Sequence, residues 1–321
     1  MKIELNEAVD FLKANDKFLI LMHGNPDGDT LGCGSALCGA LQRMGKKARV
    51  LCPDHVPARF DYMERAYENQ EFEPETIVTV DVADSKLLGE LQSIGDNADL
   101  CIDHHISNTE YAKRLLLRHD YAAAAELVYE VIKALEVEID VPLANCIYTG
   151  IATDTGCFKF SNTSPQSHIY AAELLALGVE KAMINYTMFE MKTPGRIRLE
   201  QEVLRTVKYF ADGHVALIFT SLDMLNSITD IDSDDVGALA ALPRQIQGVD
   251  IGLSIKEKKP GLYKASLRSS ERINVAEIAR AFGGGGHDRA SGCSFEDTTY
   301  EQAEKLITDA CVEACRKAGL I

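Results

Sequence analysis

The chain has 321 residues, 46% of them hydrophobic, and its 33 basic and 49 acidic residues give a formal net charge of −16 at pH 7. This length allows two domains with separate cores, and the negative charge argues against extended, unspecific binding of long nucleic acids, which requires a basic surface. Short anionic substrates remain compatible with it, because a local basic pocket and bound metal ions can override the global field.

The nine cysteines are odd in number and form no C-x-x-C pair. In a chain of this size they indicate reduced thiols and an intracellular protein. The opening residues are amphipathic and charged, without the apolar core of a signal peptide, and no apolar run approaches about 18 residues. We therefore expect a cytoplasmic protein that makes no contact with membranes.

The first half of the chain alternates short apolar runs with helical patterns. Strands are expected at 18–22, 48–52, 76–80 and 100–103, and helices at 30–44, at 122–135 and from 142 onward. This alternation is typical of βαβ units and predicts an α/β fold with a mostly parallel sheet and flanking helices. We place this domain at residues 1–185.

The pattern changes beyond Gly178. A helical stretch at 197–210, preceded by a T-P-G break at 193–195, indicates a connector, and we place a helical linker at 186–212. Strand signals then resume at 214–220, 250–256 and 263–268. They predict a smaller α+β domain at residues 213–321.

Six acidic and imidazole side chains follow or end apolar runs of the first half of the chain. In an open α/β sheet, such positions meet in the crevice at the carboxyl ends of the strands. These residues are His23, Asp27, Asp29, Asp81, His104 and Asp154.

A cluster of this kind requires cations, because carboxylates a few ångströms apart repel one another. Oxygen-rich ligands with two imidazoles and no thiolate favour a hard divalent ion, so we expect Mn²⁺ foremost, or Mg²⁺, rather than zinc. Six ligands are too many for one catalytic ion with open positions, which suggests two metal ions that share a bridging carboxylate. The predicted chemistry is hydrolysis of a phosphate ester.

The loop at 23–29 holds three of these candidates in a tight turn that Pro26 and the glycines define. By itself this loop could be an Asx-rich turn that caps the next helix. It indicates a metal site only in combination with the other segments. Near residue 81, Asp84 is the better helix cap. Asp81 is then the natural metal ligand and bridging carboxylate.

The triplet Asp103-His104-His105 follows an apolar strand. Adjacent side chains point in different directions, so the three cannot all bind one metal. We assign His104 to the metal and His105 to the substrate phosphate, whereas Asp103 orients an imidazole through its free nitrogen.

Four consecutive glycines precede His287 in the second domain. A helix end needs only one glycine, so the run suggests a backbone that closely contacts an anion through peptide N–H groups and an imidazolium. Arg268, at the end of an expected strand, is a candidate phosphate ligand, although a surface arginine explains its position equally well. The candidate substrate-binding residues are Arg268, Gly284, Gly285, Gly286 and His287.

Together these segments resemble the DHH phosphoesterase superfamily, which is named for the triplet at 103–105. The match includes the H-x-x-P-D-x-D loop at 23–29, the isolated Asp81, the D-T-G at 154–156, and a second domain of the DHHA1 type marked by L-R-S-S at 267–270 and by residues 283–292. The resemblance spans almost the whole chain. It is strongest to the bifunctional oligoribonuclease and PAP phosphatase group, the nanoRNases.

The resemblance implies a 3′–5′ oligoribonuclease that removes nucleotides from very short RNAs and also converts 3′-phosphoadenosine 5′-phosphate (PAP) to AMP. One Mn²⁺ would be bound by His23, Asp27 and Asp81, and the other by Asp29, Asp81, His104 and Asp154. The substrate phosphate would be contacted by His105, Arg268 and His287. One departure is the alanine run at 122–125, where relatives carry hydroxyl side chains, so a hydroxyl contact from that helix is not expected.

The expected partners are short RNA oligonucleotides, dinucleotides or PAP. Four alternative functions stay open: a hydrolase of linear dinucleotides such as pApA, a pyrophosphatase or polyphosphatase, a single-strand exonuclease of the RecJ kind, and a non-catalytic nucleotide-binding module. The oligomeric state also stays open, with a homodimer as one hypothesis.

Overall fold

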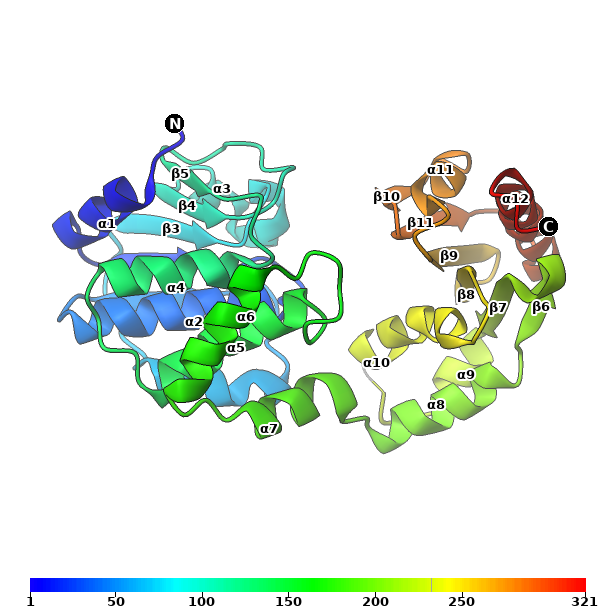
Figure 1. Ribbon diagram of the computed structural model, residues 1–321, viewed down its shortest axis with the longest axis horizontal. Coiled ribbons are helices and arrows are strands. Elements are labelled where there is room, and N and C mark those ends of the chain that lie inside the picture. Colours follow the sequence, from blue (N-terminus) through cyan, green and yellow to red (C-terminus); the bar gives the residue numbers. More distant parts are fainter. Residues whose placement is uncertain (232) are drawn as a thin grey trace. The chain divides into compact units, whose positions relative to one another are not determined.

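The computed structural model describes residues 1–231 and 233–321, and it divides into two units, Met1–Met191 and Lys192–Ile321. Each unit contains one sheet and its own apolar core (Figure 1). The α/β class expected from the sequence, with a parallel first sheet and a smaller second domain, is confirmed.

The first sheet has five parallel strands in the order β2-β1-β3-β4-β5. The strands are β1 (Phe18–Leu21), β2 (Ala48–Leu51), β3 (Thr76–Val80), β4 (Leu100–Asp103) and β5 (Leu115–Leu117). β2 lies on one side of β1 and β3 on the other, so the chain changes direction across the sheet between β2 and β3. Such a reversal leaves a crevice at the carboxyl ends of β1 and β3. His23 and Asp81 follow these two strand ends.

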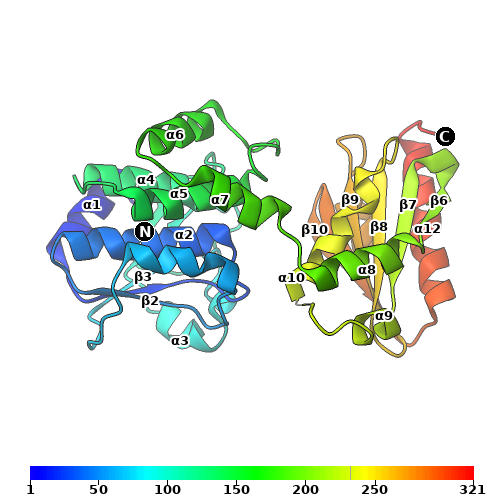
Figure 2. The same cartoon turned by 90° about the horizontal axis from the view of Figure 1, so that it is seen from below.

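Helices cover the two faces of this sheet unequally. Long helices pack on one face, whereas only the short α3 and η2 lie on the other (Figures 1 and 2). The helical segments are α1 (Leu5–Ala14), α2 (Gly28–Arg43), η1 (Ala58–Ala66), η2 (Ser85–Leu91), α3 (Gln92–Gly95), α4 (Ala124–Ala134), α5 (Val141–Asp154), α6 (Pro165–Ala176), α7 (Lys181–Asn185) and η3 (Tyr186–Glu190).

The close contact between α2 and α5 depends on glycine. A Cβ at Gly32 would lie 2.4 Å from the carbonyl oxygen of Cys146, and a Cβ at Gly150 would lie 2.7 Å from an oxygen of Asp29. Because neither residue has a side chain, the two helices approach to backbone contact. The beginning of α2 and the end of α5 therefore lie together, and each supplies an aspartate there.

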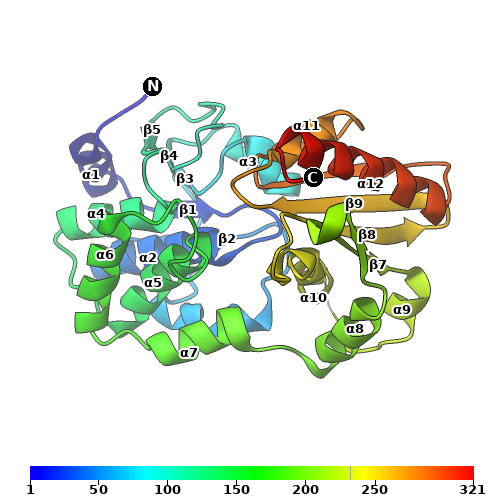
Figure 3. The ribbon, with the colours of Figure 1, turned by 45° about the vertical axis from the view of Figure 1, so that its right-hand side comes forward.

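The second unit has a six-stranded sheet in the order β10-β11-β9-β8-β7-β6, in which only β7 and β8 pair in parallel. Its core lies between this sheet and α11 and α12, and α8 to α10 lie on the other side (Figure 3). The strands are β6 (Lys208–Phe210), β7 (Val215–Thr220), β8 (Ile251–Lys259), β9 (Leu262–Ser269), β10 (Gly285–His287) and β11 (Ala290–Phe295). The helical segments are α8 (Pro194–Leu204), η4 (Ala211–Gly213), α9 (Leu222–Asn226), α10 (Ser233–Ala238), η5 (Leu239–Ala241), η6 (Pro243–Gln245), α11 (Val275–Arg280) and α12 (Tyr300–Lys317).

The helix expected at 197–210 is too long, because α8 ends at Leu204 and residues 208–210 form the edge strand β6. Pairing with β7 overrides the local helical pattern. Leu199 and Val203 of α8 also pack against Ile218 of β7. The segment expected as a linker at 186–212 is therefore, from residue 192 onward, a part of the second unit rather than a free connector.

The last two glycines of the run and His287 form an edge strand. Residues 285–287 pair with β11 as β10. Gly283 and Gly286 have positive φ angles of +72° and +135°, and a Cβ at Gly284 would lie 2.2 Å from the carbonyl oxygen of Gly292. Backbone conformation and close strand packing therefore require glycine here. Among the described residues, no helix is both long and apolar enough to span a membrane.

The glycine contact between α2 and α5 leads to a stability prediction. Gly32→Ala should lower the free energy of unfolding by about 1–3 kcal/mol, because the new methyl group meets a backbone carbonyl that cannot move aside. The matched control is Gly34→Ala on the same helix, where the methyl group would meet Sδ and Cγ of Met22, a flexible side chain rather than backbone. Urea unfolding measures both variants. Equal losses would contradict the packing argument.

Candidate metal centre

Five elements of the first unit bring the six candidate residues to one place. His23 and Asp81 follow β1 and β3, and His104 follows β4. Asp29 lies in the first turn of α2, and Asp27 caps the same helix by accepting hydrogen bonds from the backbone N–H groups of residues 29 and 30 at 3.0 and 3.2 Å. Asp154 is the last residue of α5.

The candidate ligand atoms form two groups. Within each group, all atoms lie within 4.8 Å of one another. One group consists of His23, Asp27 and Asp81, and the other consists of Asp29, His104 and Asp154.

The carboxylate of Asp81 belongs to the first group and also faces His104 of the second. Its Oδ2 is 3.6 Å from Nε2 of His23, and its Oδ1 is 3.6 Å from Nε2 of His104. The two oxygens of one carboxylate thus face different groups, which is the arrangement that a bridging ligand requires.

The burial, backbone conformation and hydrogen bonding of Asp81 are all unfavourable for an aspartate. Its side chain is 3% exposed and its backbone has a positive φ of +58°. Its Oδ1 has no hydrogen-bond partner among the described residues, and the same holds for Nε2 of His104. A strained backbone and unpaired buried polar atoms are both costly and are typical of functional sites.

The electrostatics of the site indicate that it binds a cation. Burial, together with the charges of Asp29, Asp27 and Asp154, raises the pKa of Asp81 well above its usual value. Burial and the charges of Asp29 and Asp27 also raise the pKa of Asp154 well above its usual value. A divalent cation would reverse this by neutralising the carboxylates. Oxygen-rich donors with two imidazoles fit a hard divalent metal ion.

Asp29 is stabilised by a helix other than its own. Its two oxygens accept hydrogen bonds from the backbone N–H groups of Ala124 and Ala125, at 2.6 and 2.9 Å. The N-cap residue of α4 is Ala123, which offers no side-chain cap, so Asp29 caps α4 from a distant part of the chain. Burial raises the pKa of Asp29, and these bonds oppose the increase. The alanine run is therefore consistent with a fully capped helix.

Asp103 fixes the orientation of His105. Oδ1 of the buried Asp103 accepts hydrogen bonds from the backbone of His104 and from Nδ1 of His105, both at 2.8 Å, and Oδ2 accepts one from Asn108 at 2.6 Å. Burial raises the pKa of Asp103, but these bonds outweigh it and hold the pKa below its usual value. The bond to Asp103 raises the pKa of His105.

This bond also decides how His105 can be used. A third possible metal group contains Asp81, His104 and His105. However, Nδ1 of His105 is the atom that binds Asp103, so it cannot donate a proton there and bind a metal at the same time. The bond leaves Nε2 of His105 as the other ring nitrogen, and its contact with a substrate phosphate stays a prediction.

Sequence reasoning missed two supporting residues. Asn108 holds Asp103 from the loop after β4, and Gly150 leaves the space that Asp29 occupies. The polar side chain of Asn108, which lies five residues after Asp103, was a usable signal. The role of Gly150 was not visible, because it depends on the contact between two helices distant in sequence.

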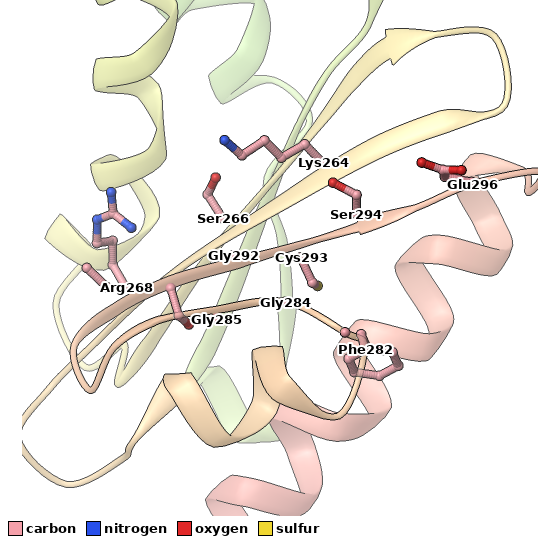
Figure 4. Close-up of a pocket in the computed structure, with 13 residues that line it drawn as sticks. Lys264, Ser266, Arg268, Phe282, Gly284, Gly285, Gly292, Cys293, Ser294 and Glu296 are labelled. Atoms are coloured by element: carbon pink, nitrogen blue, oxygen red, sulfur yellow. The ribbon is translucent and has the colours of Figure 1, made fainter. Parts of the chain in front are cut away.

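The substrate-binding candidates lie in the second unit. Arg268, Gly284 and Gly285 line a cavity of about 630 Å³ on its sheet (Figure 4). Gly286 and His287 lie in the exposed strand β10 and are not among the residues that line this cavity. Burial lowers the pKa of Arg268, and the one hydrogen bond of its side chain among the described residues goes to the carbonyl oxygen of Leu267 at 3.0 Å.

Comparisons with known proteins agree with both units. The chain matches the DHH family, N-terminal domain, over residues 17–151 and the DHHA1 domain over residues 221–316. It is 31% identical to the bifunctional oligoribonuclease and PAP phosphatase NrnA of Thermus thermophilus, over 94% of this chain and 91% of that protein. A protein of the same name from Mycoplasma pneumoniae is 28% identical over 91% of each chain.

Solved structures show the same fold. An exopolyphosphatase-related protein from Bacteroides fragilis has a TM-score of 0.86 and 26% identity, over 98% of this chain and 96% of that chain. The exonuclease RecJ bound to manganese has a TM-score of 0.56 and 14% identity, over 96% of this chain and 94% of that chain. At that identity the second comparison concerns the fold alone.

The cap that Asp29 gives to α4 can be tested without metal. Asp29→Ala should lower the free energy of unfolding by about 1–2 kcal/mol in EDTA, because two N–H groups of α4 lose their acceptor. Asp29→Asn keeps only one of the two acceptor oxygens and should lose an intermediate amount. Urea unfolding followed by circular dichroism measures both. If both variants were as stable as the parent chain, α4 would not depend on this cap.

Proposed function

Because the chain belongs to the DHH phosphoesterase family, we propose that it hydrolyses short oligoribonucleotides to nucleoside monophosphates and PAP to AMP. Two relatives that match more than nine tenths of the chain are named as bifunctional oligoribonucleases and PAP phosphatases. The observation that carries the proposal is the buried, strained Asp81, whose two oxygens face two separate groups of ligand atoms.

The proposed metal site would hold two divalent ions, with Asp81 as a ligand of both. One ion is assigned to His23, Asp27 and Asp81, and the other to Asp29, Asp81, His104 and Asp154. Mn²⁺ is the proposed ion and Mg²⁺ the alternative, because the carboxylate oxygens that dominate the site suit both ions. When bound, such ions lower the pKa of a water molecule and neutralise phosphate oxygens.

The remaining side chains of the site bind and orient the substrate. His105 is proposed to donate a hydrogen bond from Nε2 to a phosphate oxygen, since Nδ1 is held by Asp103. The raised pKa of His105 favours the charged imidazolium, and this charge stabilises negative charge that develops on the phosphate. Asn108 is a positioning residue, because it acts on the substrate only through Asp103.

The second unit is proposed to bind the rest of the substrate. Arg268 offers a guanidinium to a phosphate, and the backbone of Gly284 and Gly285 lies beside it in the same cavity. Gly286 and His287 are proposed as further contacts on the resemblance alone. The net charge of −16 supports a short substrate, because a long strand would meet acidic surface beyond the site.

The alternative functions are not favoured. Relatives over nearly the whole length are named for oligoribonucleotides and PAP, whereas RecJ is similar in fold alone. Linear dinucleotides such as pApA differ little from the proposed substrates and belong in the same test.

The first prediction here concerns the substrate. With Mn²⁺, turnover should be highest for PAP and for strands of a few nucleotides, and should fall steeply for a strand of more than about 20 nucleotides. Chromatographic identification of the products, with pApA and pyrophosphate included, measures this and also shows the direction of cleavage. Preference for pyrophosphate, or for the long strand, would overturn the proposed function.

The second prediction concerns Asp81. Asp81→Asn should lower kcat by roughly 10³-fold or more, because the bridging charge is lost, whereas unfolding in EDTA should match that of the parent chain. Mn²⁺ at about 100 times its Kd should stabilise the parent chain by about 2.7 kcal/mol, and this gain should vanish in the variant.

The control for this experiment is Asp10→Asn, which removes an exposed charge from α1. It should keep both the turnover and the stabilisation by Mn²⁺. Near-normal turnover of Asp81→Asn would contradict the bridging role, whatever its stability.

A further inference from the structure

The segment that leads into α4 is linked by hydrogen bonds to all three ligands of one metal group. These ligands are Asp29, His104 and Asp154. The backbone N–H groups of residues 124 and 125 donate to Asp29, and the carbonyl oxygen of residue 121 lies 3.2 Å from Nδ1 of His104. Nδ2 of Asn162 donates to the carbonyl oxygens of residues 122 and 154, at 3.2 and 3.1 Å. We call residues 121–125 the α4 entry.

The contact with the α4 entry sets the tautomer of His104. A carbonyl oxygen can only accept a hydrogen bond, so Nδ1 of His104 must carry the proton. In the neutral ring, Nε2 then has the lone pair that a metal ion requires. This Nε2 lies 3.6 Å from Oδ1 of Asp81 and 3.4 Å from Oδ2 of Asp154. The α4 entry therefore decides which nitrogen of His104 is available to an ion.

The other metal group is held by contacts within residues 23–30. Nδ1 of His23 lies 2.8 Å from the carbonyl oxygen of residue 24, and Asp27 accepts from the N–H groups of residues 29 and 30. Among the described residues, no hydrogen bond joins His23 or Asp27 to the α4 entry. A change in the α4 entry should therefore affect one metal group and leave the other unchanged.

Glu126 anchors the α4 entry. Its side chain is completely buried, and its Oε2 accepts a hydrogen bond from the backbone N–H of residue 122 at 3.0 Å. Glu126 is the third residue of α4, the position from which the glutamate of a capping box reaches back to the chain before the helix. This bond fixes the conformation of the α4 entry, because the N-cap residue Ala123 provides no side-chain cap of its own.

A glutamate at this position is costly unless a cation is near. Oε1 of Glu126 has no hydrogen-bond partner among the described residues. Burial raises the pKa of Glu126, Asp29 raises it further and His104 lowers it. Glu126 in turn raises the pKa of Asp154, so this carboxylate lies close to the same three ligands. A divalent ion bound by these ligands would compensate the buried charge.

We propose that Glu126 is a positioning residue for one of the two proposed metal ions, the ion nearest the α4 entry. This ion, which we call the α4 ion, is the one assigned to Asp29, Asp81, His104 and Asp154. Glu126 holds residue 122, so the α4 entry keeps its conformation and the ligands bonded to it keep their orientation. The proposal rests on the proposed function and adds a residue that acts on only one of its two ions.

The main experiment measures metal binding without substrate. Calorimetric titration with Mn²⁺ should show two ions bound to the parent chain. In Glu126→Ala, one of the two should bind on the order of 10–100-fold more weakly, because its ligands lose their support, and the other should keep its affinity. Glu126→Gln keeps an acceptor oxygen for residue 122 and should recover most of the lost affinity.

Two ligand variants identify which ion is affected. Asp27→Asn should leave the α4 ion as the one ion that binds tightly, and adding Glu126→Ala to this variant should weaken it. Asp154→Asn should leave the other ion, and there the addition of Glu126→Ala should have no effect. The difference between the two backgrounds measures the coupling of Glu126 to each ion.

Matched controls separate positioning from stability. Asn145→Ala removes another buried polar side chain, at the opposite end of α5 from Asp154, where Asn145 is bonded to Glu180. Urea unfolding in EDTA should show that this variant and Glu126→Ala are both destabilised, but Asn145→Ala should bind both ions normally. Asn162→Ala, at an exposed position, should keep the parent stability and still weaken the α4 ion, though less than Glu126→Ala does.

A second readout needs no metal. In EDTA, at a pH at which the ring is neutral, ¹⁵N NMR of His104 in the parent chain should show the proton on Nδ1. Glu126→Ala should shift the ring toward the form protonated on Nε2, because the carbonyl oxygen of residue 121 is no longer held in place.

Three results would overturn the positioning role: unchanged affinity for both ions in Glu126→Ala, an equal loss at both ions, or no recovery in Glu126→Gln. Failure of the proposed function would look different. In that case the parent chain itself would not bind a pair of Mn²⁺ ions or hydrolyse either substrate, although the effect of Glu126→Ala on the tautomer of His104 would still be measurable in EDTA.

Discussion

A buried negative charge at Asp81 is the constraint around which the first unit is arranged. Its carboxylate is almost inaccessible to water, sits on a left-handed backbone and has one oxygen without a hydrogen bond among the described residues. Among the described residues no lysine or arginine pairs with Asp81, and further carboxylates and two imidazoles lie beside it. A parallel sheet allows the arrangement, because the ends of neighbouring strands lie side by side.

Other parts of the unit hold this charged cluster in place. The absent side chains of Gly32 and Gly150 let α2 and α5 touch, so that Asp29 and Asp154 reach the strand ends. The first turn of α4 in return stabilises Asp29 through two N–H groups. Asp103 fixes His105, and Asn108 fixes Asp103. Packing, helix capping and hydrogen bonding thus all act on the same few atoms.

The two units have complementary electrostatic requirements. The first gathers carboxylates and needs cations, whereas the sheet of the second gathers Lys264, Lys256 and Arg268 and needs anions. A phosphate ester satisfies the second directly and the first through bound metal ions. A chain with a net charge of −16 can therefore still bind an anion locally, because Lys264, Lys256 and Arg268 lie together on one sheet.

The sequence by itself determined the α/β class, four of the five strands of the first sheet and the family, because alternating apolar runs and helical patterns are local signals, whereas the short edge strand β5 was not predicted. It also predicted that His23, Asp81 and His104 follow strands. Only the tertiary structure decided that residues 208–210 form a strand, that Asp29 caps α4 and that Lys256 faces Lys264. Each of these depends on which distant segments pair and in what register. Local patterns do not encode that information, because the pairing is chosen by the packing of the whole unit.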